Sequence, residues 1–363
     1  MSSDREMEQN MRIFCVPGML LAMLVATPTV NASEPVQRMF QDWQVTCNNL
    51  NDCDIRNVDE NMRVVLKHEA GPRGAISLDI MGFDIDKPSG IWLDGQLWKN
   101  SLTPISSDEE HDYAGYHTDS LQDVQAFIQA AKNAKRIALT PDEDDDTGSL
   151  KGLDASLLFV DDIQGRLDNQ TALLRVGAGI PAQVPLRYAF EIPPTKVPAI
   201  YLVSDGNALI NEVLQTQQAV LDDEECSPEA DDIARSKVEP LDKKNVLVMI
   251  NCVTGAYQSS GILFVTPRNH PDQAKEVELT LPLKDDQGDP QTISWFTDVS
   301  YDPKTAMLTH IARGRGIADC GESGAWRYDG HDFQLMSYHN QPDCDGGAPG
   351  NWPSVWLTPG FKE

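Results

Sequence analysis

The fold is decided in the stretch ARGRGIADCGESGAWRYDGHDFQL, residues Ala312 to Leu335, which carries three arginines, one cysteine and five glycines. Within it, Asp329-Gly330 predicts a two-residue type I′ hairpin turn, because both central residues of that turn need a positive φ. Trp326 and Phe333 then fall on the two flanking strands. Cys320 lies in the glycine-rich approach to this hairpin, and its place there predicts a disulfide that braces the stretch.

The opening residues have the pattern of a secretory signal. Met11-Arg12 begins a short basic region, residues 19–26 (MLLAMLVA) form an apolar core, and Val30-Asn31-Ala32 is a small-residue cleavage site. The apolar core is too short to cross a bilayer, which takes roughly 20 residues. We therefore expect residues 1–32 to be a signal peptide and the exported chain to begin near Ser33; the alternative is an uncleaved N-terminal anchor.

If the chain is exported, its cysteines are expected to form disulfides. Cys15 lies in the signal, and the six that remain are Cys47, Cys53, Cys226, Cys252, Cys320 and Cys344. An even number in an oxidising compartment favours disulfides, whereas a zinc site needs close pairs such as C-x-x-C, which this sequence lacks. Sequence proximity and the expected domain boundary pair Cys47 with Cys53, Cys226 with Cys252, and Cys320 with Cys344.

Charge and length limit the function classes. The net charge is −27, which disfavours nucleic-acid binding, since phosphates need lysine and arginine to release their counterions. The same charge disfavours an anionic membrane surface, and no membrane span is expected once the signal is removed. At 363 residues the chain is long enough for two domains.

Strand patterns dominate the first half. We expect strands at residues 40–47, 62–68, 75–81 and 136–140, a buried strand at 171–177, and a second Asp-Gly hairpin within residues 90–99 (GIWLDGQLWK). Two helices are expected as well. One follows the cap residue Ser120, and the other covers residues 153–163 and is closed by Gly165.

A proline-rich segment at residues 181–198 predicts the domain boundary, because such segments act as extended spacers. The second half opens with one helix, capped by Ser204 or Asp205 and extending to Leu221. Strands are then expected at residues 245–253, 261–266, 276–283, 292–299 and 306–313. We predict an α+β protein of two domains, 33–180 and 199–363, each an antiparallel β-structure with one or two packed helices and stapled by disulfides.

No catalytic or cofactor motif emerges from the sequence. Gly321-Glu322-Ser323-Gly324 is one residue short of the nucleophile elbow G-x-S-x-G, and Gly314-Arg315-Gly316 lacks the third glycine and the helix of a dinucleotide site. The histidines show no helical metal-binding spacing. The acidic run from Asp142 to Asp146 can be a calcium loop or a solvated loop; it lacks the ligand spacing of an EF-hand. We therefore assign no catalytic residue, metal or cofactor.

Three residues are candidates for ligand contact. Arg313 and Arg315 are cations in an acidic chain and can receive an anionic group through bidentate hydrogen bonds; the alternative is that they pair with Asp319 or Glu322. Trp326 beside the hairpin can pack on a ligand, although core packing explains most such tryptophans.

Several stretches together carry a family resemblance. They are FQDWQVTCNNLNDC (residues 40–53), LDASLLFVDDIQGRLDNQTALLRVG (153–177), RGRGIADCGESGAWRYDG (313–330), WPSVW (352–356), and Asn251-Cys252 followed by Gly255-Ala256-Tyr257. The chain thus resembles domain-of-unknown-function family 1176, exported proteins of Gram-negative bacteria. Its opening half is also similar to the invasion-associated locus B family, which shares the F-x-D-W-x-V-x-C start. The resemblance implies a periplasmic location, and it assigns no catalytic residues.

We predict a non-enzymatic periplasmic protein that binds an envelope protein or glycan. The reasons are the export signal, the cysteines, the hairpins flanked by tryptophan and the lack of a catalytic constellation. The alternatives are a periplasmic hydrolase, whose site is assembled from scattered residues, and an inhibitor of a secreted enzyme that presents the Cys320 loop as a rigid probe.

Overall fold

The computed structural model describes residues 33–58, 62–83, 85, 87–107, 113–141, 147–188, 197–285, 287–346 and 350–362. The expected signal peptide, the acidic run Asp142–Asp146 and residues 189–196 of the proline-rich segment lie outside these residues. The fold is α+β and built mostly from antiparallel strands, as the sequence predicts, and the described residues form five α-helices where three were expected.

A seven-stranded antiparallel sheet dominates the first half, in the order β1-β2-β3-β4-β5-β9-β8. Its strands are β1 (Val36–Phe40), β2 (Trp43–Cys47), β3 (Cys53–Asn57), β4 (Met62–His68), β5 (Ile76–Gly82), β8 (Thr103–Ile105) and β9 (Ala114–Thr118). A smaller sheet contains β6 (Ile91–Leu93), β7 (Gln96–Trp98), β10 (Arg136–Ala138) and β11 (Thr147–Ser149). We call the larger one the first sheet.

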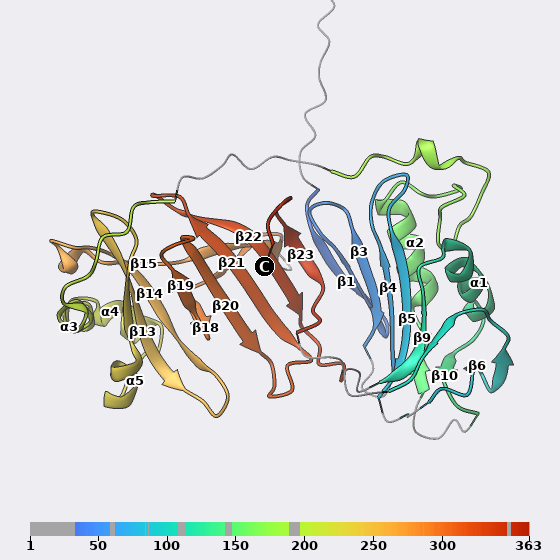
Figure 1. The fold of residues 1–363 in the computed structure, drawn as a ribbon, viewed down its shortest axis with the longest axis horizontal. Coiled ribbons are helices and arrows are strands. Elements are labelled where there is room, and N and C mark those ends of the chain that lie inside the picture. The colour runs from blue at the N-terminus through green and yellow to red at the C-terminus, as the bar shows by residue number, and fades with distance from the viewer. Residues whose placement is uncertain are drawn as a thin grey trace, which may run out of the picture. The chain divides into compact units, whose positions relative to one another are not determined.

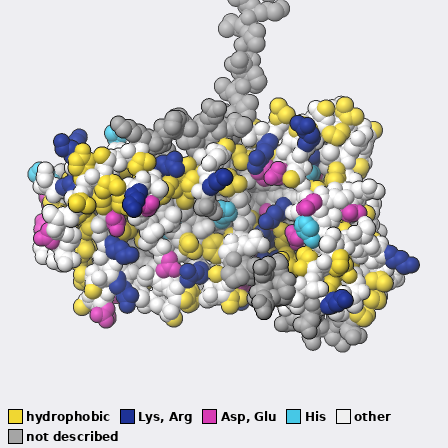
Figure 2. All heavy atoms as spheres, in the orientation of Figure 1, with side chains coloured by type: hydrophobic (Ala, Val, Ile, Leu, Met, Phe, Trp, Pro, Cys, Tyr) yellow, Lys and Arg dark blue, Asp and Glu magenta, His cyan; other side chains and the backbone are white. Residues whose placement is uncertain are grey.

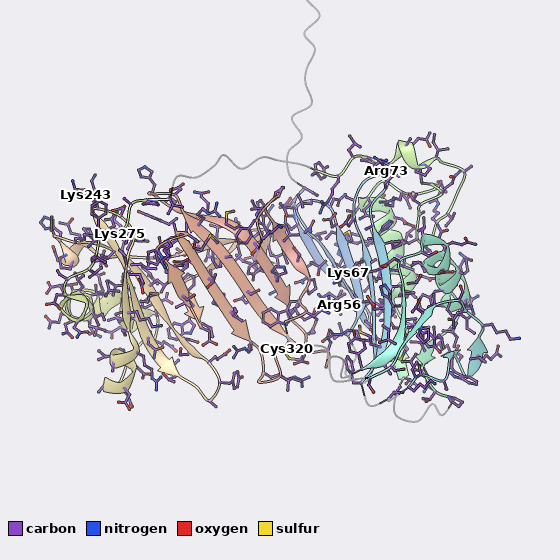
Figure 3. The ribbon with its side chains drawn as sticks, in the orientation of Figure 1. Arg56, Lys67, Arg73, Lys243, Lys275 and Cys320 are labelled. Carbon is purple, nitrogen blue, oxygen red and sulfur yellow. A yellow bond between two sulfur atoms is a disulfide. The ribbon has the colours of Figure 1, made fainter. Side chains whose placement is uncertain are left out.

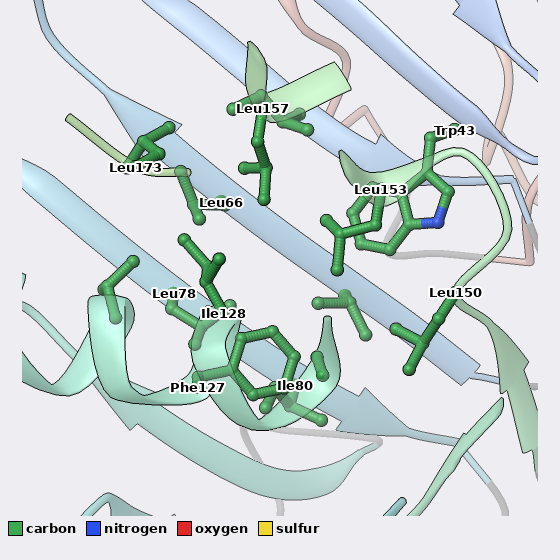
Figure 4. Close-up of a cluster of buried hydrophobic side chains, with 14 of the residues drawn as sticks. Trp43, Leu66, Leu78, Ile80, Phe127, Ile128, Leu150, Leu153, Leu157 and Leu173 are labelled. Carbon is green, nitrogen blue, oxygen red and sulfur yellow. The ribbon is translucent and has the colours of Figure 1, made fainter. Parts of the chain in front are cut away.

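Two helices, α1 (Leu121–Ala131) and α2 (Leu153–Ile163), lie on one face of the first sheet (Figure 1). Alternate strand residues meet them, and the contact is an apolar core (Figure 4) that includes Trp43, Leu66, Leu78, Phe127 and Leu157. Because strand side chains alternate between faces, the residues between these ones point to the opposite face, which carries no helix.

Two expectations for the first half are wrong. Residues 40–47 form two strands, because the chain turns at Gln41, whose φ is 55°. Residues 171–177 are not a strand. There the backbone N–H groups of Leu173, Leu174 and Arg175 donate to the buried Asp161 carboxylate at 2.6, 2.9 and 3.0 Å, so a side chain replaces a neighbouring strand as their acceptor.

The second half begins with helices α3 (Gly206–Thr216), α4 (Gln218–Asp223) and α5 (Ala230–Arg235). The single helix expected up to Leu221 is thus two helices, which meet at Gln217. One sheet has the order β12-β13-β14-β15, with β18 also paired to β14. These strands are β12 (Lys237–Pro240), β13 (Asn245–Thr254), β14 (Ser259–Pro267), β15 (Lys275–Glu276) and β18 (Trp295–Thr297).

A second sheet of this half, the last sheet, has the order β19-β20-β21-β22-β23. Its strands are β19 (Ser300–Asp302), β20 (Met307–Arg313), β21 (Gly321–Tyr328), β22 (Phe333–Gln341) and β23 (Ser354–Leu357). A ribbon of two strands, β16 (Leu279–Lys284) and β17 (Pro290–Ile293), accompanies it. The strands expected at residues 276–283 and 292–299 are each split, because their two parts pair with different partners.

Alternate residues of β13 explain how the layers stack. Leu247 and Met249 join a core with Leu308 and Trp326 of the last sheet. Val246, Val248 and Ile250 point the other way, where α3, α4 and the disulfide of Cys226 form a separate core. A strand that is apolar on both faces is therefore buried between helices and a second sheet.

The two Asp-Gly hairpins differ. Asp94 and Gly95 form the predicted two-residue turn, with φ values of 47° and 76°. The loop at Asp329-Gly330 has four residues instead of two, since Tyr328 pairs with Phe333. The Asp329 carboxylate stabilises this wider turn, because it accepts hydrogen bonds from the backbone N–H groups of His331 and Asp332 at 2.8 and 2.9 Å.

The cysteines are joined as predicted, Cys47 to Cys53, Cys226 to Cys252 and Cys320 to Cys344. The third disulfide holds the glycine-rich stretch to the segment that follows β22. That segment presents Asp345 to Arg63 of β4. The carboxylate and the guanidinium form an ion pair whose side chains are 0% and 1% exposed.

Further polar contacts surround this ion pair. Arg56 Nη1 donates to the Asn351 carbonyl at 2.9 Å, and Gln44 Nε2 donates to Gln341 Oε1 at 3.3 Å. Asn49 both donates to and accepts from the Leu357 backbone, at 3.0 and 2.8 Å. We call this set of contacts the polar seam. It joins the first sheet to the last one, and residues Asn31–Glu363 form a single compact unit.

The division at residues 181–198 stays a prediction. The apolar cores respect it, since the first contains residues from Trp43 to Leu173 and the other two are built from residues beyond Val197. Among the residues that the structure describes, no helix is long and apolar enough to cross a membrane.

The ion pair of the polar seam can be tested by removing one charge. We expect Arg63→Met to lower the free energy of unfolding by about 3–5 kcal/mol, because it leaves the Asp345 carboxylate buried without its partner. Arg63→Met combined with Asp345→Leu is expected to restore most of the loss. Urea denaturation measures both; a double variant no more stable than Arg63→Met contradicts the interpretation.

Candidate functional site

The face of the first sheet that carries no helix is polar, and the strand register aligns its side chains in rows. One row crosses four strands through Thr46, Asp54, Lys67 and Ser77. Side chains directly opposite in adjacent strands lie about 5 Å apart at Cβ, so each residue of a row contacts the next. The row brings together residues that are far apart in the sequence.

A parallel row crosses five strands through Gln44, Arg56, Val65, Asp79 and His117. Gln44 and Arg56 are buried in the polar seam, while His117 is half-buried at the other end. Polar groups therefore extend from the buried seam toward solvent. Figure 2 shows acidic, basic and histidine side chains together over this sheet.

A cleft of about 490 Å³ opens where the first row leaves the seam. One wall contains Asp54, Lys67 and Ser77 of the first sheet, and the other contains His339, Trp352 and Ser354 of the last sheet and the segment before β23. Asp52, Glu69, Asp119 and Arg187 complete its lining. Figure 3 shows Arg56 and Lys67 near one another on the sheet.

The carboxylates of the cleft are bound to partners within the protein. Arg56 Nε and Nη2 each donate to Asp54 at 2.7 Å. Burial alone raises the pKa of Asp54, but the charge and hydrogen bonds of Arg56 outweigh it, and the pKa is lowered. Asp52 accepts from Arg187 Nε at 2.9 Å and from the backbone N–H of Ala70 at 3.0 Å. Two acids of the cleft, Asp54 and Asp52, are thus already bound within the protein.

Lys67 differs from these groups. Its side chain is exposed, and within the described part of the chain its ammonium makes no ion pair or hydrogen bond. Asp54 lies opposite it in the row but is already bound at both oxygens by Arg56. Lys67 is therefore the cation of the cleft that remains available to a ligand.

Beside the cleft, His117 lies between two carboxylates. Nδ1 is 2.7 Å from Asp79 and Nε2 is 3.2 Å from Asp119. Partial burial lowers the pKa of His117, but the hydrogen bonds to Asp79 and Asp119 outweigh it, and the pKa is raised. Both ring nitrogens donate in the protonated imidazole, so this arrangement favours the cation.

The arrangement suits binding better than base catalysis. A histidine oriented by an aspartate can act as a general base only through a free lone pair on its other nitrogen. In His117 that nitrogen lies 3.2 Å from Asp119. Both ring nitrogens are thus directed at carboxylates of the protein, and the cation that the cleft offers to a ligand is Lys67.

Metal binding has no support in the described residues. The grouping of potential ligand atoms found there is Asp319 with Cys320 and Cys344. Both sulfurs belong to the third disulfide and are not available as thiolates.

The structure places Arg313 and Arg315 away from the cleft. Arg313 Nη2 is 3.3 Å from Asp298 and its Nη1 donates to the Tyr257 carbonyl at 2.8 Å. Arg315 Nε donates to Asp319 at 2.8 Å, which is the internal pairing considered in the sequence analysis. Their contact with a ligand stays a prediction.

Trp326 does not lie on an open surface. It is 1% exposed and belongs to the core between the two sheets of the second half, where it meets Phe296 edge to face at 6.4 Å. Its strand neighbours Ala325 and Arg327 point to the opposite face. Trp326 thus has the core packing that the sequence analysis gave as the alternative to ligand contact.

A larger groove, of about 620 Å³, lies on the outer face of the last sheet. Its lining is mainly apolar, with Met307, Ile311 and Phe361 among its residues, and its charged residues are Arg327 and Lys362. We favour the polar cleft as the functional site, because ion-paired side chains and the unpaired Lys67 lie close together there. Titratable groups with shifted pKa values are also typical of functional sites.

Comparison with known proteins identifies the family of the chain. A family model described as "Protein of unknown function (DUF1176)" matches residues 37–359. The chain belongs to this family. It is 30% identical over 352 residues to the uncharacterised protein YpfG of Escherichia coli strain K12, across 89% of this chain and 93% of that protein. No solved structure matches. The similarity of the first half to the invasion-associated locus B family stays a prediction.

The sequence analysis missed the cleft for a geometric reason. Lys67, Asp79 and His117 lie in no common motif, and only the strand register makes them neighbours. The available signal was the alternation of polar residues within predicted strands, as in Ser77 and Asp79 of residues 75–81.

The raised pKa of His117 predicts a pH-dependent stability. Its contribution is fully present below about pH 6.5, the ordinary histidine value, and is lost as the pH rises through the higher pKa of the folded state. We therefore expect the stability difference between the wild type and His117→Asn to shrink over that range. Denaturation at a series of pH values measures it, with the exposed His331→Asn as the control. A difference that grows with pH contradicts this assignment.

Proposed function

We propose that this protein is a non-enzymatic binding protein of the periplasm and that its cleft receives a carboxylate-bearing peptide of the cell envelope. The single observation that carries the proposal is the unpaired ammonium of Lys67 in a cleft where Asp54 is bound by Arg56 and Asp52 by Arg187. Ammonium and carboxylate form charge-assisted hydrogen bonds, which are stronger than neutral ones.

The other residues of the cleft fit such a ligand. Trp352 and Pro353 offer apolar surface on the wall opposite Lys67. Trp352 is held in place because its Nε1 donates to the Ala318 carbonyl at 3.1 Å. A rigid aromatic wall and a lone cation together favour an acidic group attached to an apolar or peptide portion.

Three observations support a periplasmic address. The opening sequence has the pattern of an export signal, three disulfides need an oxidising compartment, and the described part of the chain holds no membrane-spanning helix.

The binding proposal is tested by Lys67→Met. We expect this variant to bind a cell-wall stem peptide with a free terminal carboxylate about tenfold more weakly than the wild type, because one charge-assisted hydrogen bond is lost. Isothermal titration measures the affinity. Unfolding should be unchanged, since the side chain is exposed.

Two controls accompany this measurement. Lys151→Met removes an exposed lysine outside the cleft and should leave the affinity unchanged. The same peptide with a terminal carboxamide should bind the wild type and Lys67→Met equally. If the wild type and Lys67→Met bind the peptide with the free carboxylate equally well, the proposal is wrong.

The address is tested separately by fractionating cells and sequencing the N-terminus of the mature protein. We expect it outside the cytoplasm and beginning near Ser33, because small residues precede that position. Cytoplasmic protein that still carries Met11 contradicts export.

A hydrolase is the second candidate, favoured by the 2.7 Å contact between Asp79 and His117. Ser77 lies next to Asp79 on the same face of β5, and Ser77 would be the nucleophile of such a hydrolase. In that case Ser77→Ala abolishes peptide cleavage and keeps binding. An inhibitor that presents the Cys320 loop is less well supported, because Cys320 and Asp319 are 2% and 1% exposed.

A further inference from the structure

The groove on the outer face of the last sheet differs from the polar cleft in its charges. Its charged lining residues are Arg327 and Lys362, and no carboxylate of the described residues lines it. The chain has 56 acidic and 29 basic residues, so a groove with positive charge alone is unexpected in this protein. The groove is therefore complementary to an anion.

Arg327 supplies the fixed part of this positive charge. It lies on β21, the central strand of the last sheet (Figure 1), between Met307 of β20 and Gln334 of β22, and it is half-buried. Its Nε is enclosed by the protein, but Nη1 and Nη2 are not. Within the described part of the chain, the guanidinium makes no hydrogen bond or ion pair. The two Nη atoms are therefore accessible donors that lack an acceptor.

The strand register explains why the sheet is hollowed beside Arg327. Small residues stand next to one another there, because Ala325 of β21 lies opposite Thr309 of β20 and opposite Ser337 of β22. Ala325 and Ser337 are 7% and 1% exposed, so they form the floor of the groove. Larger and half-buried side chains, those of Met307 and Phe361, belong to the same lining.

The hydroxyl groups of the groove are mostly engaged within the protein. The Thr305 hydroxyl donates to the Asp302 carboxylate at 2.9 Å, and the Thr309 and Ser300 hydroxyls lie 2.9 Å apart. The Thr358 hydroxyl donates to a backbone carbonyl at 3.4 Å. A ligand therefore finds few free hydrogen-bonding groups along the groove.

The remaining lining is apolar and adaptable. It includes Met307, Ile311, Met336 and Phe361. Methionine is unbranched and flexible, so it adapts to a ligand that has no rigid shape. The volume of about 620 Å³ falls within the range of small-molecule sites, roughly 300–1,000 Å³. These properties favour a hydrocarbon chain over a peptide or a sugar, whose polar groups need hydrogen-bond partners.

We propose that this groove binds a long-chain fatty acid. The hydrocarbon chain lies over the floor at Ala325, and the carboxylate accepts hydrogen bonds from Nη1 and Nη2 of Arg327. Guanidinium and carboxylate match in geometry and form two parallel hydrogen bonds. Lys362, which is exposed, adds a second positive charge to the lining. The site shares no lining residue with the polar cleft and does not depend on the function proposed for it.

The test uses dodecanoate, titrated calorimetrically into the full-length mature protein below the concentration at which it forms micelles. We expect Arg327→Met to bind it about tenfold more weakly than the wild type, because the charge-assisted hydrogen bonds are lost and the apolar contact is kept. The midpoint of urea unfolding should stay the same, since no ion pair among the described residues is broken.

A second variant blocks the groove and leaves its charge in place. Ala325→Leu puts a larger side chain on the floor. It should abolish measurable binding of dodecanoate, because the hydrocarbon chain and the leucine side chain would occupy the same space.

Two further variants and a second amphiphile serve as controls. Arg73→Met removes an exposed arginine of the first half (Figure 3) and should bind dodecanoate like the wild type. Lys67→Met should do the same, which separates the groove from the cleft. Dodecyltrimethylammonium has the same chain with a cationic head, and the wild type should bind it more weakly than dodecanoate.

Three results overturn the proposal. If dodecanoate does not bind the wild type, the groove is not a fatty-acid site. If it binds the wild type and Arg327→Met equally, Arg327 does not hold the carboxylate. If the wild type binds dodecyltrimethylammonium as tightly as dodecanoate, the charge of the groove does not select its ligand.

Discussion

The buried ion pair of Arg63 and Asp345 is the contact on which the arrangement of the sheets depends. Both side chains have lost nearly all contact with water, and neither charge is tolerable there without the other. Burial, together with the charge of the nearby Arg56, lowers the pKa of Arg63 to about 9, and the guanidinium stays charged at neutral pH. An arginine on the helix-free face of a sheet ordinarily extends into solvent. Here it must be covered by an acidic partner, and the segment between β22 and β23 supplies Asp345.

The third disulfide explains how that partner is positioned. Asp345 follows Cys344 directly, and Cys320 holds Cys344 against the glycine-rich stretch. Asp319 strengthens the same place, since its carboxylate accepts from Arg315 and from the backbone N–H of Gly346 at 2.7 Å. Loops with little regular structure cannot hold a charge in place by themselves, because each free residue costs about 1–2 kcal/mol to order. The covalent bond and the aspartate remove much of that freedom.

The sequence correctly predicts the structural features that depend on residues close together along the chain. The α2 helix has the predicted bounds, the Asp94-Gly95 turn has the predicted geometry, and the cysteines are paired as sequence proximity suggests. It fails where a side chain takes backbone N–H groups that the expected structure would pair otherwise. Asp161 takes the N–H groups of a segment that has the composition of a strand, and Asp329 widens the turn to which it belongs. The cleft could not be predicted, because Lys67, Ser77 and Asp54 come together only through a strand register that no local motif encodes.

Electrostatic effects at long range and at contact distance together determine which ligands the cleft can select. A net charge of −27 repels an acidic ligand at long range, but salt screens charges beyond about 8 Å at physiological ionic strength. Inside the cleft the nearby acids are bound by Arg56, Arg187 and the backbone, so their charge is largely compensated. What a ligand meets at contact distance is Lys67. Selectivity for a carboxylate therefore does not require a basic protein. It requires a cation whose neighbouring acid already has a partner, and Lys67 meets that condition because Asp54, opposite it in the row, is bound at both oxygens by Arg56.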